Sequence, residues 1–103
     1  MATKTIAGTE VNVNEEGYME QMDQWNEEIA KEIATDIGIE LTDKHFEVLH
    51  FLREKTEAGE ALTIRKVGKS GITDIKGLYT LFPKGPLKFS SKIAGIPKPA
   101  SCV

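Results

Sequence analysis

Cysteine is almost absent from this chain of 103 residues, because Cys102, next to the last position, is the only one. One thiol cannot close an internal disulfide, whereas a secreted domain of this size commonly relies on several disulfides. Long hydrophobic runs are also missing, and no window approaches the roughly 18 uncharged apolar residues of a transmembrane helix. The first residues contain no apolar segment of the secretory type. The sequence therefore predicts one soluble domain without membrane insertion, in a reducing, cytoplasmic setting.

Each half of the chain is poor in charge of one sign. Residues 1–60 hold 15 Asp and Glu against 5 Lys and Arg, whereas residues 61–103 hold one acid, Asp74, against 8 Lys and Arg. The net charges of the two halves are therefore −10 and +7. Such polarity indicates either different partners for the two ends or two halves that neutralise each other in the fold, and both interpretations remain open.

The basic second half raises the question of nucleic-acid binding. Arg65, Lys66 and Lys69 stand where a recognition helix would be expected. However, there is no continuous basic run, and the isoelectric point of about 5.4 is acidic. A helix-turn-helix regulator that binds DNA is therefore only a third interpretation, and nucleic acid is not expected as a partner.

Hydrophobic spacing predicts a mixed fold that is mostly helical. Residues 4–13 combine β-branched side chains with a turn signal at Ala7-Gly8, which predicts a short hairpin or meander. A helix is expected to begin near Met19 and to end at Gly38. Its buried stripe is expected to comprise Met22, Trp25, Ile29 and Ile33.

The rest of the chain predicts short helices joined by glycine turns. They are expected over residues 42–56, 62–69, 73–82 and 87–94, with Ile75, Leu78, Tyr79 and Phe82 as the apolar positions of the third of these. Thr42 is a good N-cap for the longest of them. Short helices in this arrangement resemble a winged-helix core.

The predicted fold class is α+β, with a small N-terminal hairpin packed on a winged-helix-like helical array. We expect a single domain over residues 1–94, in which residues 1–38 hold the hairpin and first helix and residues 39–94 hold the helical array. Residues 95–103 are expected to form a flexible C-terminal arm that carries Cys102.

The arm makes its thiol a candidate for chemistry. Pro97 and Pro99 bar a regular helix and favour an extended chain, so the steps from Gly95 to Cys102 reach about 20 Å at roughly 3.1 Å per residue. A side chain so close to a chain end is difficult to bury, and its thiolate is the form that attacks sulfur. The alternative is a passive terminal cysteine with no role.

The two histidines do not predict a metal site. His45 and His50 are five residues apart, about 500° of helical rotation, so they point in different directions. No second cysteine is available to complete a ligand set, and we expect ordinary half-buried histidines, no metal and no cofactor.

The C-terminal third carries a specific resemblance. Residues 81–86 (LFPKGP), residues 92–99 (KIAGIPKP) and the ending Cys102-Val103 resemble the C-terminal signature of the DsrC/TusE family. The resemblance extends over nearly the whole chain. It includes Glu16-Gly17-Tyr18, Trp25, Glu40-Leu41-Thr42, Phe51-Leu52-Arg53 and Ile64-Arg65.

The resemblance implies a persulfide relay in which the penultimate cysteine, here Cys102, accepts a sulfur atom and hands it on. TusE-like members feed sulfur toward thiolation of tRNA uridine. DsrC-like members serve dissimilatory sulfite reductase and use a second cysteine eleven residues upstream, where this chain has Ser91. The intramolecular cycle of two cysteines is therefore unavailable here, and TusE-like and other single-cysteine relatives fit better.

A sulfur carrier of this kind needs partners. One thiol requires separate donor and acceptor proteins, with dissimilatory sulfite reductase as a candidate, so the chain is expected to be a sulfurtransferase-type carrier and not a stand-alone enzyme. Basic side chains would stabilise the persulfide anion or dock a partner. The candidates are Arg65, Lys92 and Lys98, together with Arg53. The second interpretation is an accessory, gamma-type protein that docks on dissimilatory sulfite reductase.

The first prediction concerns Ser91. Under mild oxidation the chain should form only intermolecular disulfides through Cys102, because no other thiol is present. Ser91→Cys should permit an internal bridge if the arm brings the two Cα atoms within about 7 Å. Non-reducing electrophoresis and intact mass of the monomer measure this bridge, and a variant that forms only dimers would show that the arm does not return to the domain.

Overall fold

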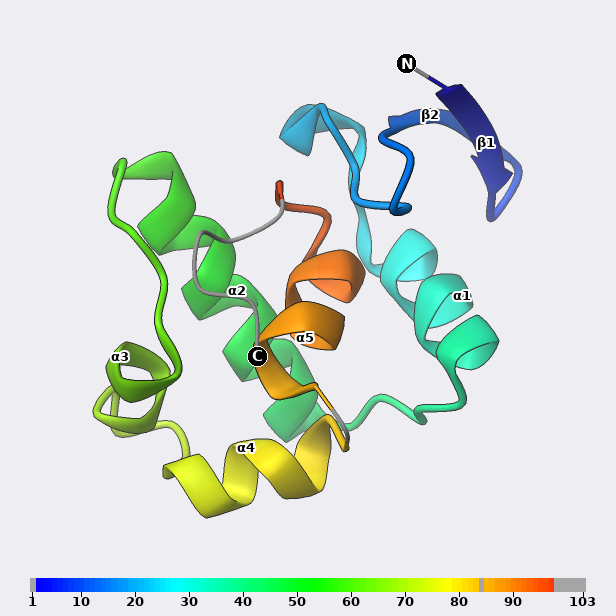
Figure 1. Cartoon of the computed structure of the whole chain (residues 1–103). Coiled ribbons are helices and arrows are strands. Elements are labelled where there is room, and N and C mark those ends of the chain that lie inside the picture. Colours follow the sequence, from blue (N-terminus) through cyan, green and yellow to red (C-terminus); the bar gives the residue numbers. More distant parts are fainter. Residues whose placement is uncertain (1, 84, 98–103) are drawn as a thin grey trace.

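The computed structural model describes residues 2–83 and 85–97, so Lys98 and Cys102 of the predicted site lie outside the described part of the chain. The predicted class, α+β and mostly helical, is confirmed (Figure 1). The elements are β1 (Ala2–Ile6), β2 (Thr9–Val13), the 3-10 helix η1 (Met22–Gln24), α1 (Glu27–Ile37), α2 (Asp43–Glu57), α3 (Ile64–Gly68), α4 (Ile75–Leu81) and α5 (Pro86–Ala94). Within the described residues, every helix is too short or too polar to span a bilayer.

The predicted N-terminal hairpin is confirmed. β1 and β2 pair antiparallel, with Ile6 opposite Thr9, and Ala7-Gly8 forms the turn with positive φ angles of 53° and 77°. Two central residues with positive φ match the twist of a two-residue hairpin. The apolar side of the hairpin packs on α1 in a small cluster formed by Ile6, Val11, Val13, Met19 and Ile29.

The first helix begins later than expected. The expectation near Met19 was wrong, because a short 3-10 turn precedes an extended residue, Trp25, and α1 starts only after Asn26. The Asn26 side chain accepts a hydrogen bond from the Ile29 N–H at 2.9 Å, which satisfies one of the free donors of the first turn. The expected end is confirmed, because Gly38 takes the left-handed conformation with a φ of 96°.

All five α-helices contribute to one main core, in which α5 lies between α1 and α2. Figure 1 shows α5 between α1 and α2, and it packs against both. Leu87, Ile93 and Ala94 of α5 are fully buried, and they join Leu49 and Leu52 of α2 in this core. α3 and α4 pack on each other. The likeness of this array to a winged helix stays a prediction.

His45 links the start of α2 to the end of α4. Its Nδ1 accepts the backbone N–H of Thr42 at 3.1 Å, and its Nε2 lies 2.8 Å from the carbonyl oxygen of Leu81. Because a carbonyl only accepts and an amide N–H only donates, the proton belongs on Nε2. The ring also meets Phe82 edge-on, with centroids 5.1 Å apart. The buried His45 is therefore a structural tie, whereas His50 on the same helix is exposed.

The second prediction compares these two histidines. His45→Ala should lower the free energy of unfolding by about 2–3 kcal/mol, because the Leu81 carbonyl and the Thr42 N–H both lose a partner. His50→Ala should lower it by less than about 1 kcal/mol, because its pairing with Glu27 is solvent-exposed. Chemical denaturation followed by circular dichroism measures both values. Equal effects would contradict the structural role of His45.

Candidate functional site

The segment that leads to Cys102 leaves the domain from the end of α5. Gly95 ends the helix in the left-handed conformation, with a φ of 69°. Ile96 is 1% exposed and belongs to the main core, and its N–H donates to the Ser91 carbonyl at 3.2 Å. Pro97, the last described residue, is exposed. The chain is therefore packed as far as Ile96, and we call Gly95 and Ile96 the root of the C-terminal segment.

Arg53 and Trp25 hold this root in place, and we call them the Arg53–Trp25 clamp. Arg53 donates from Nη1 to the Ala94 carbonyl at 2.9 Å and from Nη2 to the Met22 carbonyl at 2.8 Å. The Trp25 indole N–H donates to the Ile93 carbonyl at 2.7 Å. The last carbonyls of a helix have no partner within the helix, so side chains must satisfy them when water is excluded. The clamp does so at two successive residues of α5.

The two side chains of the clamp also contact each other. The Arg53 guanidinium carbon lies 4.4 Å from the centre of the Trp25 ring, a cation–π geometry. Gly95 packs so closely on Trp25 that a Cβ at position 95 would overlap the indole ring. A positive φ and this close approach both require glycine at position 95. The sequence therefore fixes the direction in which the chain leaves α5.

Burial affects the charge of the clamp. Removal from water lowers the pKa of Arg53, and the carboxylate of Glu57 raises it to a smaller extent. A guanidinium nevertheless keeps its proton in proteins, so Arg53 is a partly buried cation whose charge strengthens its two hydrogen bonds. Its described donors face backbone carbonyls. A direct contact between Arg53 and a persulfide stays a prediction.

Lys92 stands on the last turn of α5, beside the root. Its Nζ lies 5.3 Å from the centre of the Tyr18 ring, and Tyr18 is fully buried. This contact joins α5 to the turn that follows the hairpin, in which the Asn14 side chain accepts the Tyr18 N–H at 3.0 Å. Lys92 and Arg53 thus lie near the same end of α5.

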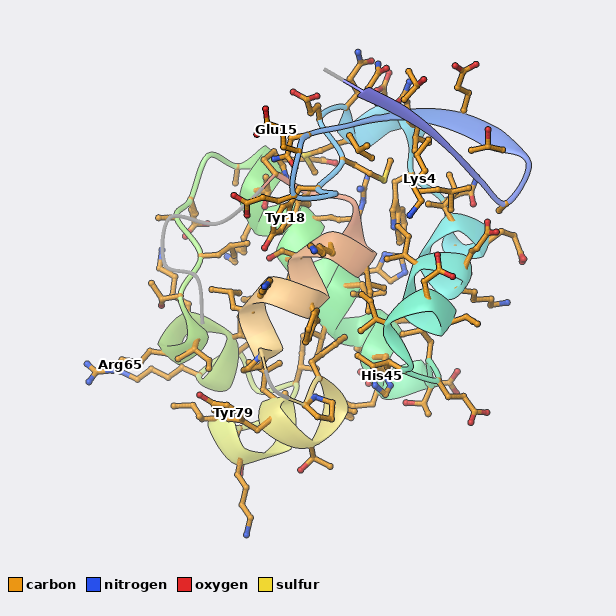
Figure 2. The ribbon with its side chains drawn as sticks, turned by 45° about the vertical axis from the view of Figure 1, so that its right-hand side comes forward. Lys4, Glu15, Tyr18, His45, Arg65 and Tyr79 are labelled. Atoms are coloured by element: carbon orange, nitrogen blue, oxygen red, sulfur yellow. The ribbon has the colours of Figure 1, made fainter. Side chains whose placement is uncertain are left out.

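Arg65 lies elsewhere. It is exposed on α3, and Figure 2 shows its side chain extending away from the body of the molecule. Lys98 falls outside the described residues, so the structure places only three of the four predicted cations. It brings Arg53 and Lys92 to the end of α5 and leaves Arg65 on the α3–α4 side. Within residues 2–83 and 85–97, no cluster of His, Cys, Asp and Glu side chains could hold a metal ion.

Ser91, the position of the second family cysteine, is fully buried within α5. Its hydroxyl oxygen has no hydrogen-bond partner among the described residues. Its backbone carbonyl accepts from Gly95 and Ile96, so it belongs to the same helix end as the clamp. A thiol introduced by Ser91→Cys would therefore start from a buried position, and bridge formation with Cys102 also reports whether this position becomes accessible.

The role of Trp25 was missed from sequence. Its spacing placed it in a helical stripe, whereas it precedes α1 and bonds to α5, 68 residues further along the chain. The only signal for this contact was the combination of one tryptophan with Gly95, because a residue that lacks a Cβ permits close packing of a ring.

The third prediction concerns the clamp. Arg53→Gln should lower the free energy of unfolding by about 2–4 kcal/mol, because two carbonyls lose a charged donor. Arg53→Lys should give an intermediate loss, because an ammonium keeps the charge but not the planar fork. Arg65→Gln is the matched control on an exposed arginine and should change stability by about 0.5 kcal/mol at most. Fluorescence of Trp25, the only tryptophan, follows denaturation at the clamp itself. Equal stabilities of Arg53→Gln and Arg65→Gln would contradict the clamp.

Comparison with known proteins agrees with this architecture. A family model described as "DsrC like protein" matches residues 5–103. "Sulfurtransferase TusE" of Salmonella typhimurium is 42% identical over 93% of this chain and 95% of its own length, and "Sulfurtransferase TusE homolog" of Haemophilus influenzae is 42% identical over 95% and 97%.

Solved structures give the same result. The NMR structure of Allochromatium vinosum DsrC has a TM-score of 0.79 and 36% identity, covering 98% of this chain and 97% of that one. The oxidized gamma-subunit of dissimilatory sulfite reductase (DsrC) from Archaeoglobus fulgidus has a TM-score of 0.82 and 31% identity, covering 99% and 100%. The family model covers residues 5–103, and the chain therefore belongs to the DsrC-like family.

Proposed function

We propose that this chain is a sulfur carrier in a sulfur relay, and that Cys102 accepts a sulfur atom as a persulfide and passes it on. The family match that runs through residue 103 carries this proposal, because it includes the single thiol of the chain at its penultimate position. Relatives named sulfurtransferase that align over more than nine-tenths of both chains support it.

The chemistry is an exchange of sulfur without net oxidation. The Cys102 thiolate attacks the outer sulfur of a persulfide on a donor protein. A new sulfur–sulfur bond forms on Cys102, the bond within the donor persulfide breaks, and the donor leaves as a thiolate. A thiolate on the acceptor repeats the same exchange at the outer sulfur of the Cys102 persulfide. Each step follows the rules of thiol–disulfide exchange, in which attack requires the thiolate and access to the sulfur.

This exchange requires two kinds of partner, a sulfur-donor protein and a sulfur-acceptor protein. A carrier with one thiol meets them in turn, so its thiol has to reach into the active site of each. The proposed organisation, a domain over residues 1–94 followed by an arm over residues 95–103, provides this reach from Pro97 onward, because Gly95 and Ile96 are packed on the domain. The Arg53–Trp25 clamp supports it, because it fixes the root from which the arm starts.

The cations near the arm have proposed roles in the same exchange. Lys92 stands on the last turn of α5, and Lys98 is four positions before Cys102 in sequence. A cation near a persulfide favours its anionic form and thereby its reactivity. Arg53 is proposed to act on the arm through its root, whereas Arg65 is proposed as a docking residue.

A second candidate is an accessory role on dissimilatory sulfite reductase. The likeness to gamma-subunit structures favours it, with TM-scores of 0.82 and 0.79 for the proteins from Archaeoglobus fulgidus and Pyrobaculum aerophilum. Ser91 weighs against it, because a hydroxyl cannot form the sulfur bridge that two-cysteine members make with their penultimate cysteine. The genes that neighbour this one would separate the two candidates.

The fourth prediction tests the carrier role. The full-length protein is incubated with a cysteine desulfurase and cysteine, and its intact mass is measured without reductant. The wild-type chain should gain the mass of one sulfur atom, and Cys102→Ser should gain none while its melting temperature stays the same. Sulfur addition to Cys102→Ser, or none to the wild type when a known acceptor is loaded in parallel, would refute the proposal.

A further inference from the structure

The side of the molecule formed by α3 and α4 carries a groove of about 540 Å³. We call its lining the α3–α4 groove; it comprises Arg65, Gly68, Lys69, Asp74, Ile75 and Lys76. None of these residues belongs to the clamp or the root. The groove therefore needs an explanation of its own.

Two apolar side chains of α4 lie open to solvent, one in the groove and one a helical turn further along. Ile75 and Tyr79 are 42% and 45% exposed, and they are the two large hydrophobic residues so exposed in the described part of the chain. They are four residues apart on α4, so they project from one face of the helix. Exposed apolar groups that cluster among polar ones mark interaction surfaces.

The cations of the groove have no acidic partner. Arg65, Lys69 and Lys76 form no ion pair with any described residue, whereas neighbouring Lys66 pairs with Glu60 at 3.8 Å. The one carboxylate of the groove, Asp74, accepts the Gly77 N–H at 2.6 Å and caps α4. Three cations without an ion-pair partner among residues 2–83 and 85–97 thus line the groove beside the apolar side chain of Ile75.

The groove is also preformed. α3 and α4 meet at Gly68, where a Cβ would come within 2.6 Å of Cγ1 of Ile75. The connecting turn is held by Ser70, whose hydroxyl donates to the Val67 carbonyl at 2.6 Å and accepts the Ile72 N–H at 3.2 Å. A rigid site loses little conformational entropy when a ligand binds.

We propose that the α3–α4 groove, with Tyr79 at its side, is a docking site for an acidic segment of a partner protein that inserts an apolar side chain against Ile75. Carboxylates of such a segment would pair with Arg65, Lys69 and Lys76. Tyrosine and arginine are enriched among the residues that dominate binding energy at protein interfaces, and Figure 2 shows Arg65 and Tyr79 on the same side of the molecule. The proposal rests on residues of α3 and α4 and does not depend on sulfur transfer.

A protein fits this groove better than a nucleic acid does. Nucleic-acid binding relies on many phosphate contacts, and affinity falls when fixed negative charge stands nearby. Here Asp74 lines the groove, and the remainder of the domain is strongly acidic. An exposed apolar side chain beside three cations instead matches a short peptide with mixed character, and a small contact of this kind gives a transient complex.

The test is an NMR titration of the ¹⁵N-labelled full-length chain. The probe is a synthetic peptide with a central leucine and phenylalanine, flanked on both sides by glutamates. Two control peptides replace the glutamates by lysine or the two apolar residues by serine, and a single-stranded oligonucleotide of mixed sequence tests the nucleic-acid alternative. Amide shifts should concentrate at Arg65, Lys69, Ile75 and Tyr79 with the probe peptide, and the control peptides should bind at least about tenfold more weakly.

Two variants locate the binding energy. Lys69→Glu should weaken binding by at least about tenfold, because like charges then face each other across the contact. Lys31→Glu carries the same charge change on α1 and should leave the affinity within about twofold, because α1 is not part of the groove. Binding should also weaken as salt rises from about 0.05 to 0.5 M, because exposed charges are screened.

The inference is overturned by any of four results. These are no shifts at the groove up to millimolar peptide, equal binding of the serine control, equal losses for Lys69→Glu and Lys31→Glu, or tighter binding of the oligonucleotide at the same residues. Sulfur loading of Cys102 is measured separately, so failure here would remove the docking role of Arg65 and leave the sulfur-carrier role of Cys102 untouched.

Discussion

The guanidinium of Arg53 is the point where three distant parts of the chain meet. It donates to Met22 ahead of α1 and to Ala94 at the end of α5, and it lies on the ring of Trp25. Both carbonyls would otherwise be shut away from water without a partner, at a cost of about 1–3 kcal/mol each. Together with the core packing of α5, this side chain ties the end of the helix and the start of the C-terminal segment to η1 and α2.

The unequal charge of the two halves is little reduced by the ion pairs of the described residues. Among these pairs, Lys66–Glu60 joins the basic half to the acidic half, and the others lie within residues 1–60. The α3–α4 groove is where unpaired positive charge meets exposed apolar surface.

Local signals in the sequence were sufficient for most element boundaries. Gly38 ends α1 as expected, since a left-handed residue after a helix favours glycine, and Thr42 precedes α2. The predicted start of α1 near Met19 was wrong. Apolar residues at helical spacing continue back through Trp25, but the Asn26 side chain caps the helix and α1 begins after it. On α4, Leu78 is buried whereas Tyr79 is exposed. Two adjacent apolar residues do not indicate which of them is buried, because this depends on where the neighbouring helix packs.

Some residues of the candidate site could be identified from the sequence, and others could not. Cys102 could be singled out because position along the chain and residue type alone identify it, and the family resemblance needs only sequence. The roles of Arg53 and Trp25 could not be predicted from the sequence, because their hydrogen-bond partners are backbone carbonyls 41 and 68 residues away. Carbonyls are present at every residue, so no sequence pattern indicates which of them a side chain will reach.

The burial of Ile93, Ala94 and Ile96 has a consequence for synthesis of the protein. These residues stand at the very end of the domain, yet they fill the centre of its main core. Chains fold from the N-terminus as they leave the ribosome, so this core stays open until Ile96 has emerged. Until then, the apolar side chains that α2 contributes to the core lack their partners on α5 and stay accessible to chaperones.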